Sequence, residues 1–311
     1  MAVRVRWRTN PANAAVGTLL LLITLNVLFT PHFATTSNVW NVLLQVATVV
    51  LVAIGMTFVI GSGGIDLSVG SVMALAGAIA AVTLGYGVLL AAGAAFAGAT
   101  LVGILNGTLI ARLRVQPIVV TLATLIACRG LAQVISHEGE LVTIDDPSML
   151  LLGRGHLGPV PVPVLVALVA VSGAVYLLRL TPFARYVLAV GGNREAARLA
   201  GVPVQGTLVT VYAMSAALAA VAGLVVAARL GASDAAKIGQ NMELDAIAAV
   251  VVGGTALSGG RATVLGTIAG ALIMQVIATS FNMLLVPYAW SLALKAAIIL
   301  IAVYVQRPAR V

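Results

Sequence analysis

The sequence has few charged residues. Aspartate, glutamate, lysine and arginine make up 8% of its 311 residues, whereas soluble globular domains usually carry about 25%. Hydrophobic residues make up 61%. A soluble domain of this size would not stay dispersed in water with so little charge, so the composition indicates that lipid is the main solvent.

Cysteine and lysine are also scarce. Cys128 is the one cysteine, which excludes an internal disulfide and a cysteine-based metal site. Neither Lys237 nor Lys295 follows a glycine, so the chain has no phosphate-binding loop of the type G-x-x-x-x-G-K-[ST]. The three histidines lack metal-ligand spacing, and no nucleophile pairs with a base. We therefore expect no enzyme activity, no cofactor and no ATP site in this chain.

Long apolar runs are abundant. They continue for about 20 residues without alternation, which predicts membrane-spanning helices and disfavours a barrel of strands. The first run follows a basic stretch, as in a secretory signal, but no clear cleavage site follows, so we expect it to be retained. The expected fold is all-α, a single transmembrane domain over residues 1–311 with about ten spans: 13–30, 40–61, 67–85, 87–111, 116–136, 162–180, 207–229, 242–258, 262–282 and 289–306. The segment 242–258 is short and glycine-rich, so a broken or re-entrant helix is the alternative there.

The distribution of basic residues predicts the orientation. The net charge of +8 is spread over scattered arginines, with no run longer than the alternating Arg4, Arg6 and Arg8, so it does not indicate nucleic-acid binding. Ten spans with both termini in the cytoplasm place most of the seventeen basic residues inside, as the positive-inside rule requires. The acidic residues gather in the outer loops, where they either solvate the loops or form a docking rim for an external partner. The basic residues expected on the cytoplasmic side are Arg4, Arg6, Arg8, Arg112, Arg114, Arg179, Arg185, Arg194, Arg198, Arg261, Arg307 and Arg310.

A hydrophilic cytoplasmic segment runs from about 181 to 205. Asn193 is a plausible N-cap, and Gly201 followed by Pro203 predicts the end of a short helix. Arg194 and Arg198, one turn apart, give this helix a basic face. The helix either keeps a loop ordered or contacts a cytoplasmic subunit.

Two glycine-rich stretches interrupt the apolar pattern. Residues 61–71 read GSGGIDLSVGS and contain Gly64, Asp66 and Ser68. Broken backbone inside a membrane is tolerated only within protein or beside a wet cavity. An acid at this depth is a candidate functional residue, although Asp66 could instead cap the following helix.

The second stretch, residues 242–261, carries Glu243 and Asp245 at its outer edge. Arg129 and Lys295 are the cations inside the spans that are available to neutralise them. We therefore predict that Lys295 or Arg129 pairs with Asp245, Glu243 or Asp66. Glu243, Asp245, Arg129 and Lys295 are therefore candidate residues of a translocation pathway. Gly64, Asp66 and Ser68 of the first stretch are the other candidates.

Over nearly its full length, the chain resembles the permease subunits of bacterial ABC sugar importers, of the ribose and galactofuranose type, within a superfamily that includes branched-chain amino acid permeases. The residues that carry the resemblance are AIGMTFVIGSGGIDLSVGSVMALAG (53–77), NG (106–107), QPIVVTLATLIACRG (116–130), AVGGNREAARLAGV (189–202) and ELDAIAAVVVGGTALSGGR (243–261).

The resemblance implies a permease in the bacterial inner membrane that translocates a monosaccharide. It also implies a second permease copy or paralogue, cytoplasmic ATP-binding subunits and a periplasmic sugar-binding protein. The family's coupling segment corresponds to Gly192, Asn193, Arg194, Glu195, Ala196, Ala197, Arg198 and Gly201. Two alternatives remain: a permease for branched-chain amino acids or nucleosides, and a channel or secondary carrier that works without an ATPase.

Overall fold

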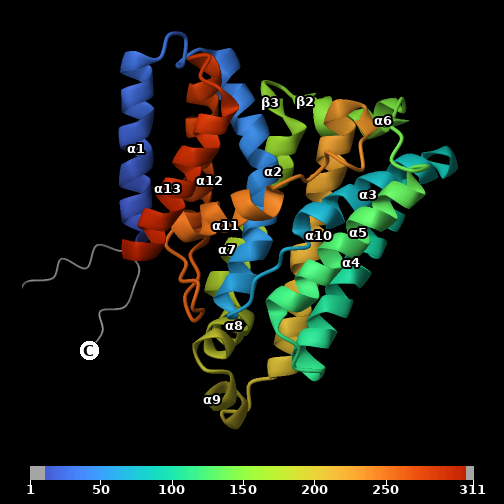
Figure 1. Ribbon diagram of the computed structural model, residues 1–311, viewed down its shortest axis with the longest axis vertical. Helices are drawn as coiled ribbons and strands as arrows, with labels where there is room; N and C mark the ends of the chain where they lie inside the picture. The colour runs from blue at the N-terminus through green and yellow to red at the C-terminus, as the bar shows by residue number, and fades with distance from the viewer. Residues whose placement is uncertain (1–10, 306–311) are drawn as a thin grey trace, which may run out of the picture.

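The computed structural model describes residues 11–305 and consists almost entirely of helices (Figure 1). The helices are α1 (Pro11–Phe29), α2 (Thr36–Gly61), α3 (Val69–Thr83), the short 3₁₀ helix η1 (Leu84–Tyr86), α4 (Val88–Arg112), α5 (Pro117–Ile135), α6 (Pro147–Arg154), α7 (Val162–Leu180), α8 (Pro182–Gly192), α9 (Arg194–Leu199), α10 (Val204–Leu230), α11 (Met242–Val252), α12 (Val264–Met283) and α13 (Tyr288–Val305). Two small antiparallel pairs complete it: β1 (Val142–Thr143) with β4 (Ala232–Ser233), and β2 (His156–Leu157) with β3 (Val160–Pro161).

The all-α membrane fold is confirmed. Within residues 11–305, eight helical segments are long and apolar enough to cross a bilayer, and they correspond to eight of the ten predicted spans. The last predicted span, 289–306, corresponds to α13, whose apolar stretch, Ala289–Ala302, is shorter. The predicted span 242–258 contains α11. The number of crossings and the cytoplasmic position of both termini stay predictions, and Arg4, Arg6, Arg8, Arg307 and Arg310 lie outside the described residues.

Helix α11 differs from a full span. Its 11 residues rise about 16 Å, roughly half of the 30 Å hydrocarbon core. It ends at Gly253 and Gly254, and a side chain on Gly253 would overlap the backbone of Gly266 in α12. The chain then runs toward the end of the bundle that carries α8 and returns to α12 (Figure 1). The broken-helix alternative therefore describes this segment.

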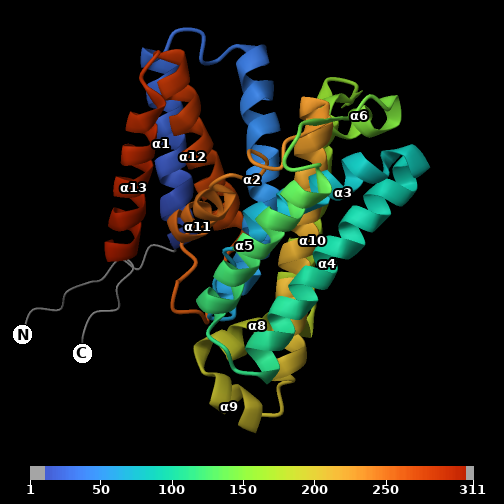
Figure 2. The same ribbon diagram turned by 45° about the vertical axis from the view of Figure 1, so that its right-hand side comes forward.

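Helix α3 also starts within the bundle. Helix α2 ends at the end of the bundle that carries α8, and residues 62–68 then run back along the bundle to the point where α3 begins (Figure 1). Figure 2 shows α11 lying across the bundle near α2 and α12, and these three helices contact one another. The bundle thus contains one half-length helix, α11, and a second helix, α3, that begins inside it, and each is joined to a neighbour by non-helical chain.

Helices α2, α3 and α10 form the core. From Val46 to Gly61 every residue of α2 is buried. Helix α10 packs closely on α4, where a Cβ on Gly107 would lie 2.6 Å from the Val209 Cα atom. Small residues allow such close crossings between helices in lipid. By contrast, exposed apolar side chains cover α1, α4 and α5, as expected for faces in contact with lipid.

Candidate functional site

The first glycine-rich break centres on Asp66, whose side chain is 1% exposed. One carboxylate oxygen accepts hydrogen bonds from the Ser68 amide (3.0 Å) and the Ser68 hydroxyl (2.6 Å). The other accepts a hydrogen bond from the Ser215 hydroxyl of α10 at 2.9 Å. The capping alternative accounts for only the contact with the Ser68 amide, since Ser68 is itself the N-cap of α3. Asp66 also ties the break to a distant helix.

This hydrogen-bond network extends to two more helices. The Ser68 hydroxyl accepts a hydrogen bond from the side-chain Nδ2 atom of Asn106 in α4 at 3.2 Å. The side-chain Oδ1 atom of Asn106 accepts one from the Thr124 hydroxyl of α5 at 2.6 Å. Thr121 of α5 donates to the Ile65 carbonyl oxygen at 3.2 Å. Neither Asp66 nor Ser68 is open to solvent in this conformation. Their predicted place in a pathway stays a prediction.

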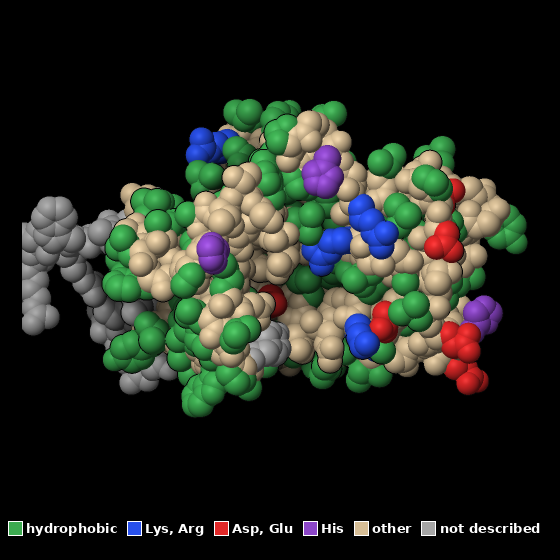
Figure 3. All heavy atoms as spheres, turned by 90° about the horizontal axis from the view of Figure 1, so that it is seen from above, with side chains coloured by type: hydrophobic (Ala, Val, Ile, Leu, Met, Phe, Trp, Pro, Cys, Tyr) green, Lys and Arg blue, Asp and Glu red, His purple; other side chains and the backbone are tan. Residues whose placement is uncertain are grey.

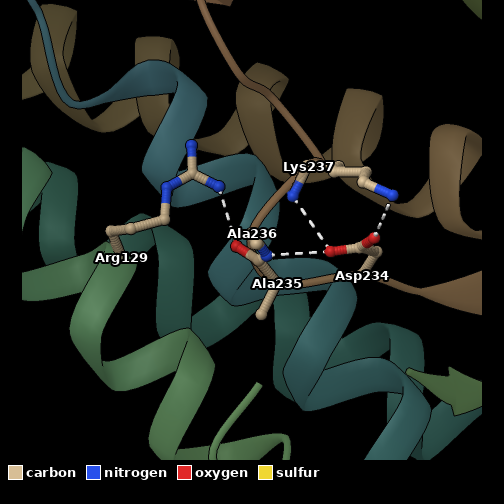
Figure 4. Close-up of polar contacts among 5 residues, drawn as sticks. All are labelled: Arg129, Asp234, Ala235, Ala236 and Lys237. Atoms are coloured by element: carbon tan, nitrogen blue, oxygen red, sulfur yellow. Dashed lines mark hydrogen bonds and ion pairs between the residues drawn. The ribbon is translucent and has the colours of Figure 1, made fainter. Parts of the chain in front are cut away.

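A second break, residues 231–241, joins α10 to α11 and is held by Arg129. One guanidinium nitrogen of Arg129 donates to the carbonyl oxygens of Ala235 (2.8 Å) and Ile238 (2.7 Å). Figure 4 shows Arg129 reaching from α5 to this loop, where Asp234 accepts from the amides of Ala236 and Lys237. Arg129 therefore binds backbone carbonyls of a loop, which have no partners within a helix.

Of the predicted charge pairs, the structure forms the one between Lys295 and Asp245. The Lys295 Nζ atom of α13 lies 2.9 Å from an Asp245 carboxylate oxygen in the first turn of α11, and the two side chains are 11% and 33% exposed. Arg129 forms no ion pair with Glu243 or Asp66 among the described residues. The pair fixes the half-length helix α11 to α13.

We expect Lys295→Met or Asp245→Asn to destabilise the protein by about 1–3 kcal/mol, because each leaves a half-buried charge without its partner. The double charge swap Asp245→Lys with Lys295→Asp should recover part of the loss. Thermal unfolding of the detergent-solubilised protein measures both effects. The matched control is Lys237→Ala, which breaks the Asp234 ion pair at a lysine that is 81% exposed; equal effects at the two lysines would contradict the prediction.

The loop ends of the bundle differ in charge. The predicted outer end carries β1, β2 and α6, and acidic side chains gather toward one edge of that face (Figure 3). The residues of the outer loop before α6 include Glu138, Glu140 and Asp145, all exposed. This placement is compatible with both alternatives for the acidic loops.

At the opposite end, α8 and α9 form the predicted coupling segment. The Asn193 side chain accepts a hydrogen bond from the Ala196 amide at 2.9 Å, so the predicted N-cap is confirmed. Gly201 ends the segment in a left-handed conformation (φ 80°), as glycine permits. Ala197 is 5% exposed and packs with Ala111 and Leu208, which fixes α9 to α4 and α10. The predicted short helix is α9, and a second helix that was not predicted, α8, precedes it in the same segment.

A charged cavity adjoins α9. It measures about 640 Å³ and lies between α9, the end of α4 and the start of α10. Its charged lining residues are Arg114, Arg194, Glu195 and Arg198. Within it, Arg198 forms an exposed ion pair with Glu195 at 3.0 Å, so the two other arginines leave a positive excess.

Three glycine pairs meet where α8 ends. The amide of Gly260 donates to the carbonyl oxygen of Gly61 at 3.0 Å. A Cβ on Gly191 would overlap the same Gly61 oxygen and lie 2.7 Å from the Gly260 nitrogen, while one on Gly259 would lie 2.9 Å from the Gly63 Cα atom. We call this contact of residues 61–63, 191–192 and 259–260 the glycine junction. It joins the coupling segment directly to the end of α2, at the start of the first break, and to the loop between α11 and α12.

Sequence reasoning did not find that Ser215 donates to Asp66 or that Asn106 donates to Ser68. Ser215 and Asn106 lie in long apolar runs, where single small polar residues are common. Tyr212 was also missed: its hydroxyl has no hydrogen-bond partner within residues 11–305 and faces Gly64, where a side chain would overlap it. The helical spacing of Tyr212 and Ser215, one turn apart on α10, is the signal that points both toward the first break.

Comparison with known proteins agrees with this architecture. Residues 38–303 match the family described as branched-chain amino acid transport system / permease component. The chain belongs to this permease family. The permease is 39% identical over 290 residues to the ribose import permease protein RbsC of Haemophilus influenzae, covering 92% of this chain and 90% of the relative.

Two further relatives have similar coverage. The galactofuranose transporter permease protein YtfT of Escherichia coli is 39% identical over 319 residues, covering 97% of the permease and 91% of the relative. The L-arabinose ABC transporter permease protein AraH of Azospirillum brasilense is 37% identical over 300 residues, covering 96% and 88%. No solved structure gave a significant match.

Proposed function

We propose that this protein is the membrane-spanning subunit of an ATP-binding cassette importer that carries a monosaccharide, such as ribose or galactofuranose, across the bacterial inner membrane. Relatives that match nearly the whole chain are named for ribose, galactofuranose and arabinose transport. The observation that carries the mechanism is the glycine junction, because it connects a cytoplasmic segment to the chain that precedes α3 and to the loop that follows α11.

Energy enters through the coupling segment in this proposal. ATP is bound and hydrolysed on a separate cytoplasmic subunit that contacts Gly192, Asn193, Arg194, Glu195, Ala196, Ala197, Arg198 and Gly201. The basic cavity beside α9 fits an acidic side chain of that subunit. A second permease, as a copy or a paralogue, and a periplasmic sugar-binding protein complete the importer. Residues 1–311 act as one permease domain.

Movement of α8 and α9 is passed on through the glycine junction. Backbone contacts without intervening side chains transmit a displacement directly, since no rotamer change absorbs it. The junction shifts the chain segments before α3 and α12, and with them the packing of α2, α3 and α10. Two arrangements of these helices, one open to each side, give alternating access that ATP hydrolysis biases. Gly64, Asp66, Ser68, Arg129, Glu243, Asp245 and Lys295 belong to the elements that move along the pathway.

Transport by proteoliposomes tests the proposal. We expect uptake of labelled ribose or galactofuranose only when the permease is combined with its ATP-binding subunit, its binding protein and ATP. Uptake by the permease alone would instead favour a channel or secondary carrier.

The family description favours a second candidate cargo, a branched-chain amino acid. Competition with an excess of unlabelled pentose, hexose, nucleoside or leucine separates the cargo classes. We expect only monosaccharides to compete, and inhibition by leucine alone would replace the proposed cargo.

A further inference from the structure

A face of α2 and α12 carries polar side chains, most of them amides, that the architecture does not otherwise explain. On α2, Ser37, Asn41 and Gln45 recur every four residues and are exposed. Residues four apart lie on one face of a helix. On α12, Gln275 and Asn282 lie about two turns apart, and Gln275 faces α2. We call these residues the amide face.

The two glutamines join the helices at the same depth. The Gln275 Nε2 atom donates to the Gln45 Oε1 atom at 2.8 Å and to the Thr279 hydroxyl at 3.3 Å. Gln45 lies nine residues from the outer end of α2, and Gln275 eight residues from the outer end of α12. At 1.5 Å per residue both are about 12–14 Å below those ends, which is well inside a 30 Å core.

The amide face has unused hydrogen-bonding capacity. Within residues 11–305, the Gln45 nitrogen, the Gln275 oxygen and the Asn41 side chain have no hydrogen-bond partner, and all three residues remain at least partly accessible. Polar groups without partners are expensive in contact with hydrocarbon. Water, a polar solute or a polar surface of the second permease must therefore meet this face.

The position along α2 supports the same conclusion. Exposure on this face ends at Gln45, and every residue from Val46 to Gly61 is buried. Helices α2 and α12 both pack against α11, whose first turn holds the partly exposed Asp245. The accessible polar face thus reaches from the outer end of the bundle to about the level at which the helices close together.

We propose that the amide face is the outer part of the sugar pathway, with Asn41, Gln45 and Gln275 as hydrogen-bonding residues for a polyhydroxylated solute. This inference rests on the proposed function and gives it a location. A carboxamide offers both a donor and an acceptor, as a sugar hydroxyl does. Gln45 and Gln275 can therefore exchange their mutual hydrogen bond for hydrogen bonds to a passing solute. Hydrogen bonds from neutral amides are weaker than those from charged side chains, and weak binding suits a solute that has to pass through.

Accessibility to a thiol reagent tests the location. The one native cysteine, Cys128, is buried, so single-cysteine variants can be read directly. In the complete importer, in right-side-out vesicles, we expect Asn41→Cys, Gln45→Cys and Gln275→Cys to react with a charged, membrane-impermeant methanethiosulfonate, and uptake to fall after reaction. The matched control is Leu101→Cys, a 64% exposed position in the middle of α4, which should stay unreactive. Absence of reaction at all three amide positions would overturn the proposal.

Substitution tests the chemical role. Gln45→Leu and Gln275→Leu should each lower monosaccharide uptake roughly fivefold per unit of inserted protein, the effect of losing one uncharged hydrogen bond. Gln275→Asn should keep more activity than Gln275→Leu. Normal uptake by both leucine variants would refute the inference while leaving the proposed function intact. Failure of the native importer to carry any monosaccharide would refute the proposed function, and the thiol reaction would still report the pathway.

Discussion

Replacement of Gly191 by alanine is expected to uncouple ATP hydrolysis from uptake. The new Cβ atom would overlap the Gly61 carbonyl oxygen and lie 2.7 Å from the Gly260 nitrogen. The groups it meets are backbone, so no side chain can turn aside, and α8 must move away from the glycine junction. Overpacking of this kind costs about 1–3 kcal/mol. If that energy acts on the balance between the two transport states, uptake changes roughly tenfold to a hundredfold.

The neighbouring residue provides a matched control. A Cβ on Gly192 meets nothing within 4 Å, although it is the next residue of the same helix. Gly61→Ala is an intermediate case, because its Cβ would lie 3.1 Å from the Ala262 Cβ atom. The amount of sugar transported for each ATP hydrolysed, measured in proteoliposomes, should therefore fall most for Gly191→Ala, less for Gly61→Ala and least for Gly192→Ala, which adds a methyl group to the coupling segment without displacing the junction. Equal values for Gly191→Ala and Gly192→Ala would mean that the junction does not carry the coupling.

Local signals in the sequence predicted the first break and the cap of α9. The glycines of residues 61–71 marked the first break, and the Asn193 cap followed from its side chain and from the stop at Gly201. The glycines of residues 242–261 marked the interruption between α11 and α12, whereas the second break, residues 231–241, lies before that predicted stretch. These features depend on neighbours in the chain, since turns and caps form within a few residues. The pair of Lys295 and Asp245 was one of several possible pairs, because the sequence provides few cations and acids inside the spans.

Contacts between distant segments could not be predicted in the same way. The glycine junction brings together three glycine motifs, at residues 61–63, 191–192 and 259–260, that are far apart in the sequence, and nothing in any one of them identifies the other two. Ser215 and Gln275 are single polar residues in apolar helices, and only the rotation of each helix decides whether they face protein, lipid or water. For α11, the composition allowed a full span, but the helix stops early, just before Gly254, which has a left-handed conformation (φ 89°).

The two interrupted segments have different supports, which bears on what moves. The first break is held by side-chain hydrogen bonds to α4, α5 and α10. The second is held by Arg129 and by the close packing of Gly239 on Gly70 of α3. Because α3 contacts both breaks, a shift of α3 cannot leave either unchanged. The junction at the α8 end and the amide face at the other end are thus connected through the same central helices.

Replacement of Asp66 by leucine is expected to cause the largest loss of folded protein. Leucine is similar in size but leaves the Ser68 amide, the Ser68 hydroxyl and the Ser215 hydroxyl without their buried acceptor. Each unsatisfied group costs about 1–3 kcal/mol, so the total is on the order of 3 kcal/mol or more. Ser215→Ala removes a single bond and should cost about 1 kcal/mol. Thermal unfolding and the amount of protein in the membrane measure both, and similar losses for the two variants would contradict a central role for the carboxylate.

The variant Asp66→Asn separates stability from transport. Asparagine keeps the oxygen that accepts from Ser68, and its amide can donate to Ser215 if that hydroxyl turns, so most of the network survives. The carboxylate, however, is lost from the point where α3 begins and α10 passes. We expect uptake to fall further than the amount of inserted protein. If uptake falls only in proportion to protein, Asp66 is structural, and transport depends on the network it holds together.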